Sequence, residues 1–197
     1  MSNEVKAKFP GNPDIVRKGI VEFLKYIGED PNREGLKGTP DRVVKSYEEL
    51  FSGYLKDPKD VMTVFSEKDV VHKDQIILLK NIEFYSTCEH HLLPFIGVAH
   101  LAYIPSDKVI GISKLARILE IYARRLQIQE RIGDQVTMAL MNLLDAEGAA
   151  CIIESKHLCI NCRGIGKQNA LMVTSSLKGA FLANIKTRQE LLTLIKN

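Results

Sequence analysis

The sequence predicts an α+β protein with an antiparallel sheet. Apolar residues recur at helical spacing in two segments near the start of the chain. Residues 76–86 and 95–104 are rich in β-branched and aromatic side chains and are separated by a short connection, which is typical of two antiparallel strands. The expected elements follow the order helices, two strands, two helices, two strands, helix. Because this order lacks alternating βαβ units, it favours α+β over a parallel α/β sheet.

The first part of the chain carries the start and stop signals of two helices. Residues 1–11 are polar and are expected to form a loose arm. Asn12-Pro13 has the pattern of a helix start, a capping residue before a proline in the first turn, and Gly28 is expected to end that helix. Thr39-Pro40 repeats the start signal, and Gly53 is expected to close the second helix. These two helices predict an N-terminal helical region.

The pattern changes from helical to β-rich after about residue 60. We therefore assign residues 1–58 to an N-terminal arm and helical region, and residues 59–197 to a second domain. Turn residues and helix caps delimit the elements that we expect there after the first two strands. They are a helix capped by Ser113, a helix over residues 129–144 that is stopped by Gly148, strands over residues 149–160 and 170–177, and a C-terminal helix with the capping box Thr187–Glu190.

Composition and charge exclude several classes of protein. The 197 residues are 45% apolar and 26% charged, as in an ordinary globular protein. No apolar run approaches the roughly 18–20 residues that a membrane-spanning helix needs, and the N-terminus lacks a hydrophobic signal segment. The formal charge of +3 is small and the basic residues are dispersed, which gives no support to nucleic-acid binding. We expect a cytoplasmic protein with neither a membrane nor a nucleic-acid partner.

Two clusters of cysteine and histidine are the strongest functional signal in the sequence. Cys88-Glu89-His90-His91 offers a thiolate and an imidazole three positions apart, a spacing that can place both on one metal ion. The second cluster is His157-Leu158-Cys159. If it lies on a strand, its first and third side chains point to the same face and can address one site together.

Three of these residues would form a catalytic zinc site. Cys88, His91 and Cys159 would leave the fourth position of a tetrahedral zinc ion open for water. Zinc lowers the pKa of bound water to roughly 7, so that hydroxide is present at neutral pH. His90 or His157 could then supply or remove protons during attack.

Other arrangements of the same residues are possible. Cys162 could join the three ligands and close the site, which would then hold zinc for structural reasons alone. The cysteines could also be buried without a metal, as we expect for Cys151. His100 alternates along an apolar strand and is interpreted as a structural residue.

Five segments resemble motifs of the GTP cyclohydrolase I family. They occur in the order of the family and cover roughly residues 12–196, so that together they are far more specific than any one of them. The segments are Thr39–Val43, Ser86–His91, Gly111–Arg117, Gln127–Arg131 and His157–Gly164.

The resemblance implies a fold, an assembly and a reaction. The fold is the tunnelling fold (T-fold), an antiparallel sheet with helices on one face, which makes residues 59–197 the catalytic domain. Family members form toroidal homodecamers of two facing pentamers. They convert GTP and water to 7,8-dihydroneopterin triphosphate and formate, the entry to folate and other pterins. The expected partners are therefore GTP as substrate and further copies of the chain, with active sites at subunit interfaces.

The resemblance also assigns roles at the reacting centre. It implies one zinc ion per subunit and makes Cys162 incidental. His157 resembles the family histidine that is proposed to protonate the purine, and His90 resembles a second one that takes part in proton transfer. The implied zinc ligands are Cys88, His91 and Cys159.

Seven further residues match family positions that contact the substrate. Glu130 suits the guanine because a carboxylate accepts from both the N1–H and the 2-amino group. Lysine and arginine side chains suit the triphosphate, and a serine, which could equally be an ordinary helix cap, lies near the ribose. The residues are Glu130 and Gln129 for the base, Ser113 for the ribose, Lys114, Arg117 and Arg163 for the triphosphate, and Arg42 reaching in from a neighbouring subunit.

Three other functions remain compatible with the residues alone. The chain could be a non-hydrolytic pterin or purine binding module, because one fold hosts several chemistries. It could be a structural zinc protein, or a sister enzyme that acts on another pterin-like substrate. The two histidines favour an enzyme, and the acidic and basic matches favour a guanine nucleotide triphosphate.

Overall fold

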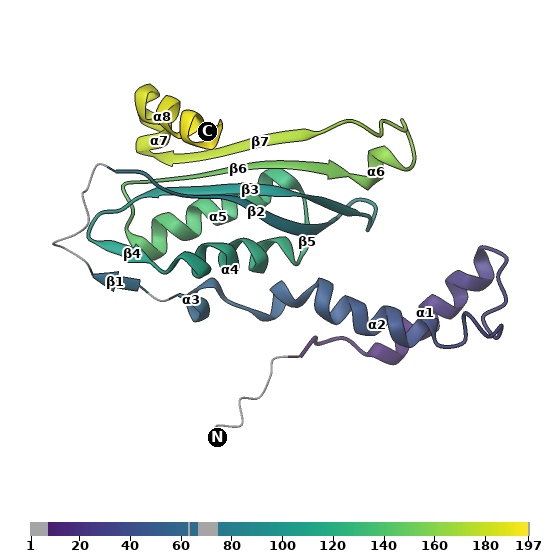
Figure 1. Ribbon diagram of the computed structural model, residues 1–197. Coiled ribbons are helices and arrows are strands. Elements are labelled where there is room, and N and C mark those ends of the chain that lie inside the picture. Colours follow the sequence, from purple (N-terminus) through teal and green to yellow (C-terminus); the bar gives the residue numbers. More distant parts are fainter. Residues whose placement is uncertain (1–7, 63, 67–74, 197) are drawn as a thin grey trace, which may run out of the picture.

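The computed structural model describes residues 8–62, 64–66 and 75–196 (Figure 1), so that residues 1–7 of the expected arm lie outside the described part. The helices are α1 (Pro13–Tyr26), α2 (Thr39–Leu50), the 3₁₀ helix η1 (Ser52–Leu55), α3 (Pro58–Val61), α4 (Ile112–Ala123), α5 (Gln129–Leu144), α6 (Leu158–Asn161), α7 (Ala180–Ala183) and α8 (Ile185–Lys196). The strands are β1 (Val64–Ser66), β2 (Ile77–Cys88), β3 (Pro94–Ile104), β4 (Lys108–Ile110), β5 (Leu126–Gln127), β6 (Gly148–His157) and β7 (Met172–Gly179).

A mostly antiparallel sheet organises the molecule. Its five strands lie in the order β5-β2-β3-β6-β7, and only the short pair β2–β5 is parallel. Strand β3 runs through the centre and pairs along its length with β2 on one side and β6 on the other. A separate two-stranded sheet joins β1 to β4. The predicted α+β class with an antiparallel sheet is confirmed.

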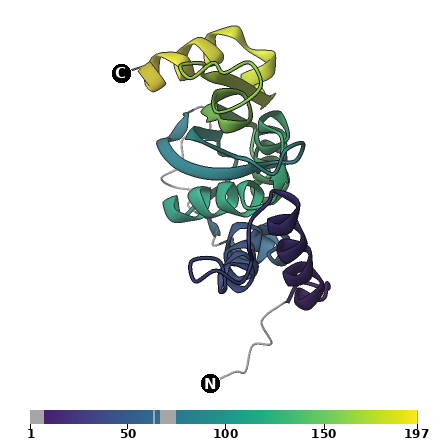
Figure 2. The same cartoon turned by 90° about the vertical axis from the view of Figure 1, so that its right-hand side faces the viewer.

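Helices α4 and α5 cover one face of the sheet, and the C-terminal helices lie on the other side of it (Figures 1 and 2). Side chains alternate between the two faces, as the period of a strand requires. Leu101 and Ile153 belong to the core under α4 and α5. Ala102 and Ile152 belong to a second, smaller core that includes Leu191 of α8. The central strands are therefore buried on both faces.

The N-terminal helices begin and end near the predicted positions. The Asn12 side chain accepts a hydrogen bond from the Asp14 amide (2.9 Å) and caps α1, and Gly28 follows its end with φ +87°. Helix α2 is capped by Gly38 rather than Thr39, and it ends at Leu50, before Gly53.

Gly53 serves as a close-contact residue instead of a helix stop. A Cβ atom there would lie 2.1 Å from the Ile121 carbonyl oxygen, and its amide donates to the Arg124 carbonyl (3.0 Å). The absence of a side chain thus lets the N-terminal region approach the end of α4.

Four predictions for residues 59–197 are wrong, because the helix caps and strand ends lie at residues other than the predicted ones. Ser113 does not cap α4, because Gly111 is the cap and Ser113 is already helical. Thr187 does not cap α8: that helix starts at Ile185, where the Asn184 side chain accepts from the Lys186 amide (2.9 Å).

The other two errors concern the ends of β6. Helix α5 ends at Asp145 in the left-handed conformation (φ +50°), so that Gly148 is the first residue of β6 and not a stop. Strand β6 ends at His157, not at residue 160, because His157 pairs with Phe95 and the next residue of β3, Pro94, has no N–H to continue the ladder.

Candidate metal centre and active site

The predicted zinc ligands meet where β2 and β6 end. The ligand atoms of Cys88, His91 and Cys159 all lie within 4.8 Å of one another. A tight turn after β2 orients the first two: the Leu92 amide donates to the Cys88 carbonyl (2.9 Å), and the Cys88 amide donates to the Leu93 carbonyl (2.8 Å). The structure therefore contains a group of two thiols and one imidazole that is able to hold a metal ion.

Cys159 reaches this group by a route that differs from the predicted one. It lies in the short helix α6 and not on a strand beside His157. The change from strand to helix after His157 turns the chain, so that Cys159 faces Cys88. Burial and the neighbouring Cys88 thiol raise the pKa of Cys159, while Arg163 lowers it. A cation between the two sulfur atoms would relieve this unfavourable arrangement, because it stabilises the thiolates.

Cys162 is separate from the group. Its thiol is exposed and donates to the Leu158 carbonyl (2.9 Å). Among the described residues, the metal-capable cluster comprises three side chains and not four. Cys151 is buried in the core, which raises the pKa of its thiol, as expected for a structural cysteine.

His157 stands beside the metal-capable group in a fixed orientation. Its ring stacks on Phe95, with centroids 4.4 Å apart and planes within 4°. Its Nε2 lies 2.9 Å from the Gln129 Oε1 atom. Burial lowers the pKa of His157, and the nearby Glu130 carboxylate partly opposes that effect. A neutral imidazole is thus favoured near pH 7.

The Gln129 side chain is buried and forms hydrogen bonds to several protein groups. It is the first residue of α5 and is 1% exposed. Its amide nitrogen lies 3.0 Å from the Ile153 carbonyl, 3.1 Å from the Met172 carbonyl and 3.0 Å from the Thr174 hydroxyl. Its oxygen accepts from the Ser155 hydroxyl (2.6 Å) and faces His157. These bonds tie α5 to β6 and β7.

An ion pair fixes the turn that carries two of the three ligands. Arg131 of α5 holds both carboxylate oxygens of Glu89, at 2.5 and 3.1 Å. This hydrogen-bonded pair lowers the pKa of Glu89. The Glu89 amide also donates to the Gln127 carbonyl (3.0 Å). The exposed His90, next in the chain, has Nδ1 3.9 Å from the Cys88 sulfur.

Comparison with known proteins identifies the family. The family model described as GTP cyclohydrolase I matches residues 16–196. The chain belongs to the GTP cyclohydrolase I family. The predicted family and enzyme class are therefore confirmed, together with the fold class.

Curated relatives agree with the family model. GTP cyclohydrolase 1 of Campylobacter jejuni (strain RM1221) is 51% identical over 180 residues, which are 90% of this chain and 93% of that protein. GTP cyclohydrolase 1 of Wolinella succinogenes is 49% identical over 179 residues, 90% of this chain and 94% of that protein. A crystal structure of the archaeosine synthase QueF-Like in the apo form matches 55% of this chain and 97% of that chain, with a TM-score of 0.45 and 15% identity.

One set of residues that resembles substrate contacts of the GTP cyclohydrolase I family lies at the metal end of the sheet. Glu130 is exposed at the start of α5 and acts electrostatically on His157. Arg163 follows α6 and is close enough to Cys159 to lower the pKa of its thiol. Glu130 and Gln129 are thus linked to the metal end of the sheet through His157, and Arg163 is linked to it through Cys159.

A second set lies at the opposite end. Ser113, Lys114 and Arg117 occupy the first half of α4, which follows β4 at the far end of β3 (Figure 1). The Ile110 amide, just before α4, donates to the Tyr103 hydroxyl (3.2 Å), whereas the metal-bearing turn adjoins Pro94. At about 3.3 Å per residue, β3 separates these ends by on the order of 30 Å.

Arg42 also lies apart from the metal-capable group. It is part of α2, and its guanidinium donates to the Gly35 carbonyl (3.1 Å) and the Thr39 hydroxyl (2.8 Å). The structure therefore does not bring Arg42, Ser113 or the α4 cations to the metal-capable group of the same chain.

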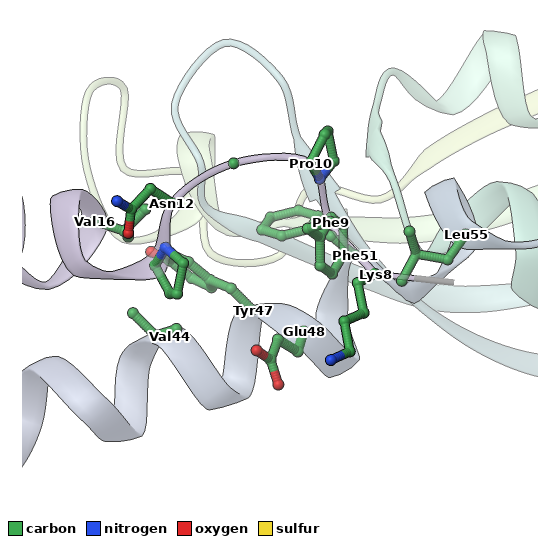
Figure 3. Close-up of a pocket in the computed structure, with 12 residues that line it drawn as sticks. Lys8, Phe9, Pro10, Asn12, Val16, Val44, Tyr47, Glu48, Phe51 and Leu55 are labelled. Carbon is green, nitrogen blue, oxygen red and sulfur yellow. The ribbon is translucent and has the colours of Figure 1, made fainter. Parts of the chain in front are cut away.

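A cavity of about 870 Å³ lies between the N-terminal arm and the helices α1 and α2 (Figure 3). Its wall is mostly apolar and includes Phe9, Tyr47 and Phe51. It contains none of the predicted site residues, so we do not assign the reaction to it. Among the described residues, no helix combines the length and apolar character needed to cross a membrane.

The sequence reasoning missed three residues that shape the site, namely Phe95, Ser155 and Arg131. Phe95 lies opposite His157 on the neighbouring strand, and this neighbour can be found only when the strand register is known. Ser155 lies two positions before His157 on β6 and therefore points to the same face of the sheet. Arg131 was part of a matching segment, but its partner Glu89 is 42 residues away in the sequence.

Proposed function

We propose that the chain is a zinc-dependent GTP cyclohydrolase I that opens the imidazole ring of the guanine of GTP at carbon 8. The products would be 7,8-dihydroneopterin triphosphate and formate, as the family resemblance implies. The observation that carries this proposal is the convergence of Cys88, His91 and Cys159 within 4.8 Å, with the oriented His157 two positions before Cys159 in the chain.

The donor set suits zinc in a catalytic setting. Two thiolates and one imidazole are ligands that zinc prefers, and three protein ligands leave a fourth position for water or substrate. When bound there, zinc would lower the pKa of its water to roughly 7 and so supply a hydroxide-like nucleophile. Cys88, His91 and Cys159 would hold the ion, and the Glu89–Arg131 pair keeps the turn in place.

The two histidines have distinct environments that suit proton transfer. His157 is held by Phe95 and Gln129 and is kept neutral by burial, so that it can take up a proton and deliver it to the purine. His90 is exposed beside Cys88 and can exchange protons with solvent. We assign His157 to the substrate side and His90 to the second proton transfer.

Charge complementarity supports GTP as the substrate. Glu130 would accept from the N1–H and the 2-amino group of the guanine. Arg163 would bind a phosphate oxygen beside the metal. Gln129 is buried and turned toward protein atoms, so we assign it no hydrogen bond to the base.

The complete site requires a second copy of the chain. Lys114 and Arg117 would bind the triphosphate and Ser113 would lie near the ribose, yet all three lie in the first half of α4, which begins at the end of β3 that is remote from the metal-capable group. A neighbouring α4 would bring them to the metal end, and a neighbouring Arg42 would join them. The predicted homodecamer with sites at subunit interfaces accounts for this separation. The decamer, the cytoplasmic location and the division at residues 58 and 59 remain predictions.

The test combines the metal and the reaction. We expect Cys88→Ser to lose bound zinc and both products, measured as zinc per chain, formate release and pterin absorbance from GTP. Cys162→Ala is the matched control, because its thiol lies outside the metal-capable group, and it should keep zinc and turnover. A zinc-free Cys88→Ser enzyme that still releases formate would refute the assignment.

A further inference from the structure

The orientation of the Gln129 side-chain amide is determined by its surroundings. Two of the groups facing the Nε2 atom are backbone carbonyls, of Ile153 at 3.0 Å and of Met172 at 3.1 Å. Carbonyl oxygens only accept hydrogen bonds, so the NH₂ group must face them. The reversed amide would place an oxygen against two oxygens inside the protein, where repulsion and lost hydrogen bonds are costly.

This orientation determines which ring nitrogen of His157 carries a proton. The Gln129 Oε1 atom lies 2.9 Å from the His157 Nε2 atom and only accepts, so that Nε2 must donate. The Ser155 hydroxyl donates to the same oxygen (2.6 Å), which a carbonyl oxygen with two lone pairs permits. In the neutral ring the proton therefore sits on Nε2, and Nδ1 has the lone pair.

Two contacts fix the ring. Stacking on Phe95, with planes within 4°, sets the plane of the imidazole. The bond to Gln129 determines that the Nε2 edge of the ring faces α5. Gln129 is itself held from β6 and β7, so the ring cannot turn without breaking a buried network.

We propose that Gln129 is a positioning residue that fixes the Nε2–H tautomer of His157, so that the ring presents the lone pair of Nδ1 in a single orientation. The Nε2–H···Oε1 bond ties the ring to α5, and stacking on Phe95 holds its plane. Under the proposed function, the Nδ1 edge would be the one that faces the purine. Gln129 would then act on the reaction through His157 and not by touching the substrate.

This inference deepens the proposed function and rests on it for the identity of the proton acceptor. It replaces the expected contact between Gln129 and the guanine with a contact to His157. The two roles differ in kinetics. A residue that binds the base equally in ground state and transition state changes KM, whereas one that orients the proton donor changes kcat.

The kinetic test uses Gln129→Met, which keeps the length of the side chain and removes the acceptor. We expect kcat to fall by about 100-fold, the usual scale of one acid–base catalyst, and KM for GTP to change by less than about twofold. Thr174→Val is the matched control, because it removes one partner of the Gln129 NH₂ group and leaves Oε1 in place. It should keep kcat. A Gln129→Met enzyme with unchanged kcat and raised KM would overturn the proposal.

A second measurement does not need turnover and reads the tautomer in the wild-type protein. In ¹⁵N-histidine-labelled wild-type protein, the His157 signal, assigned by its loss in His157→Gln, should show a protonated Nε2 and an unprotonated Nδ1 above the pKa of the ring. A proton on Nδ1 would overturn the proposal. Because this readout does not require GTP hydrolysis, a failed turnover assay together with an Nε2–H tautomer would reject the proposed function while keeping the orientation by Gln129.

Discussion

The two ends of strand β3 differ in how much of the proposed active site a single chain builds there. At the Pro94 end, the metal-bearing turn is closed by backbone hydrogen bonds and pinned by Arg131, and His157 is held by a buried network. At the Ile104 end, Arg117 projects from the first half of α4 into solvent. One end has its geometry built within a single chain. The other offers cations in the first half of α4, which starts at the end of β3 that is remote from the metal-capable group.

This difference indicates how the catalytic unit is divided. Metal ligands and proton donors need precise placement, which rigid strands and buried hydrogen bonds provide. Phosphate-binding cations can be delivered from another chain, because charge attraction tolerates a less rigid arrangement. Under the proposed function, each site would combine the metal end of one chain with the first half of α4 from another.

The largest expected effect tests whether the two ends of β3 contribute to sites that are shared between chains. Cys88→Ser and Arg117→Ala should each be nearly inactive alone, because each lacks one half of every site. When the two chains are mixed and reassembled, sites built from two chains recover roughly a quarter of wild-type activity, since each contributing chain is intact at its own residue half of the time. The measurement is pterin formation by the mixed oligomer. No recovery, with assembly verified by size-exclusion chromatography, would show that both halves come from one chain.

A smaller effect is expected when the turn at the metal end loses its ion pair. Arg131→Met removes both hydrogen bonds to Glu89 and should loosen the turn that carries Cys88 and His91. We expect zinc affinity to fall by about tenfold, as for the loss of other supporting contacts at metal sites. Competition with a chelator measures it.

The matched control for this variant is Arg33→Met. Arg33 forms an exposed ion pair with Glu29 (2.6 Å) in the N-terminal region, and its loss should leave zinc affinity unchanged. Equal affinities of Arg131→Met and wild type would mean that the backbone alone holds the turn.

The smallest effect concerns the middle of the sheet. His100 is buried on β3 and accepts a hydrogen bond through Nδ1 from the Asn81 amide (3.3 Å), at the irregular point of β2. Burial lowers the pKa of His100 from 6.5; Glu154 opposes this effect and Lys80 adds to it. Because the folded state favours the neutral ring, the contribution of His100 to the free energy of unfolding is fully present above pH 6.5. That contribution is lost as the pH falls through the folded-state pKa of the ring.

Urea denaturation between pH 7 and 5 tests this expectation. The free energy of unfolding should fall by at most about 1.4 kcal/mol per pH unit from this one group. His100→Gln keeps an acceptor for Asn81 without a titrating ring, and should remove that part of the slope. Parallel pH profiles of the two proteins would contradict the role of His100.

Local patterns predicted much of the fold and the ligand set. The Asn12 cap, the strand pair around the metal-bearing turn and the α5 helix follow from residues within a few positions of one another. The errors at Ser113 and Thr187 arose because a neighbouring residue, Gly111 or Asn184, could also serve as the cap. The backbone conformation chooses between such neighbours, and composition does not reveal it.

The sequence by itself determined which metal chemistry is possible, because the thiol and imidazole ligands sit in two short clusters whose spacing is visible. Only the tertiary structure decided that Cys162 stays outside the metal-capable group and that Gln129 faces His157. It also separated Arg117 from the metal end. The placement of Gln129 depends on strand register and on contacts between residues 24 or more positions apart, such as that with Ile153, which no local pattern specifies. The placement of Cys162 depends on the short helix α6, after which its thiol donates to the Leu158 carbonyl.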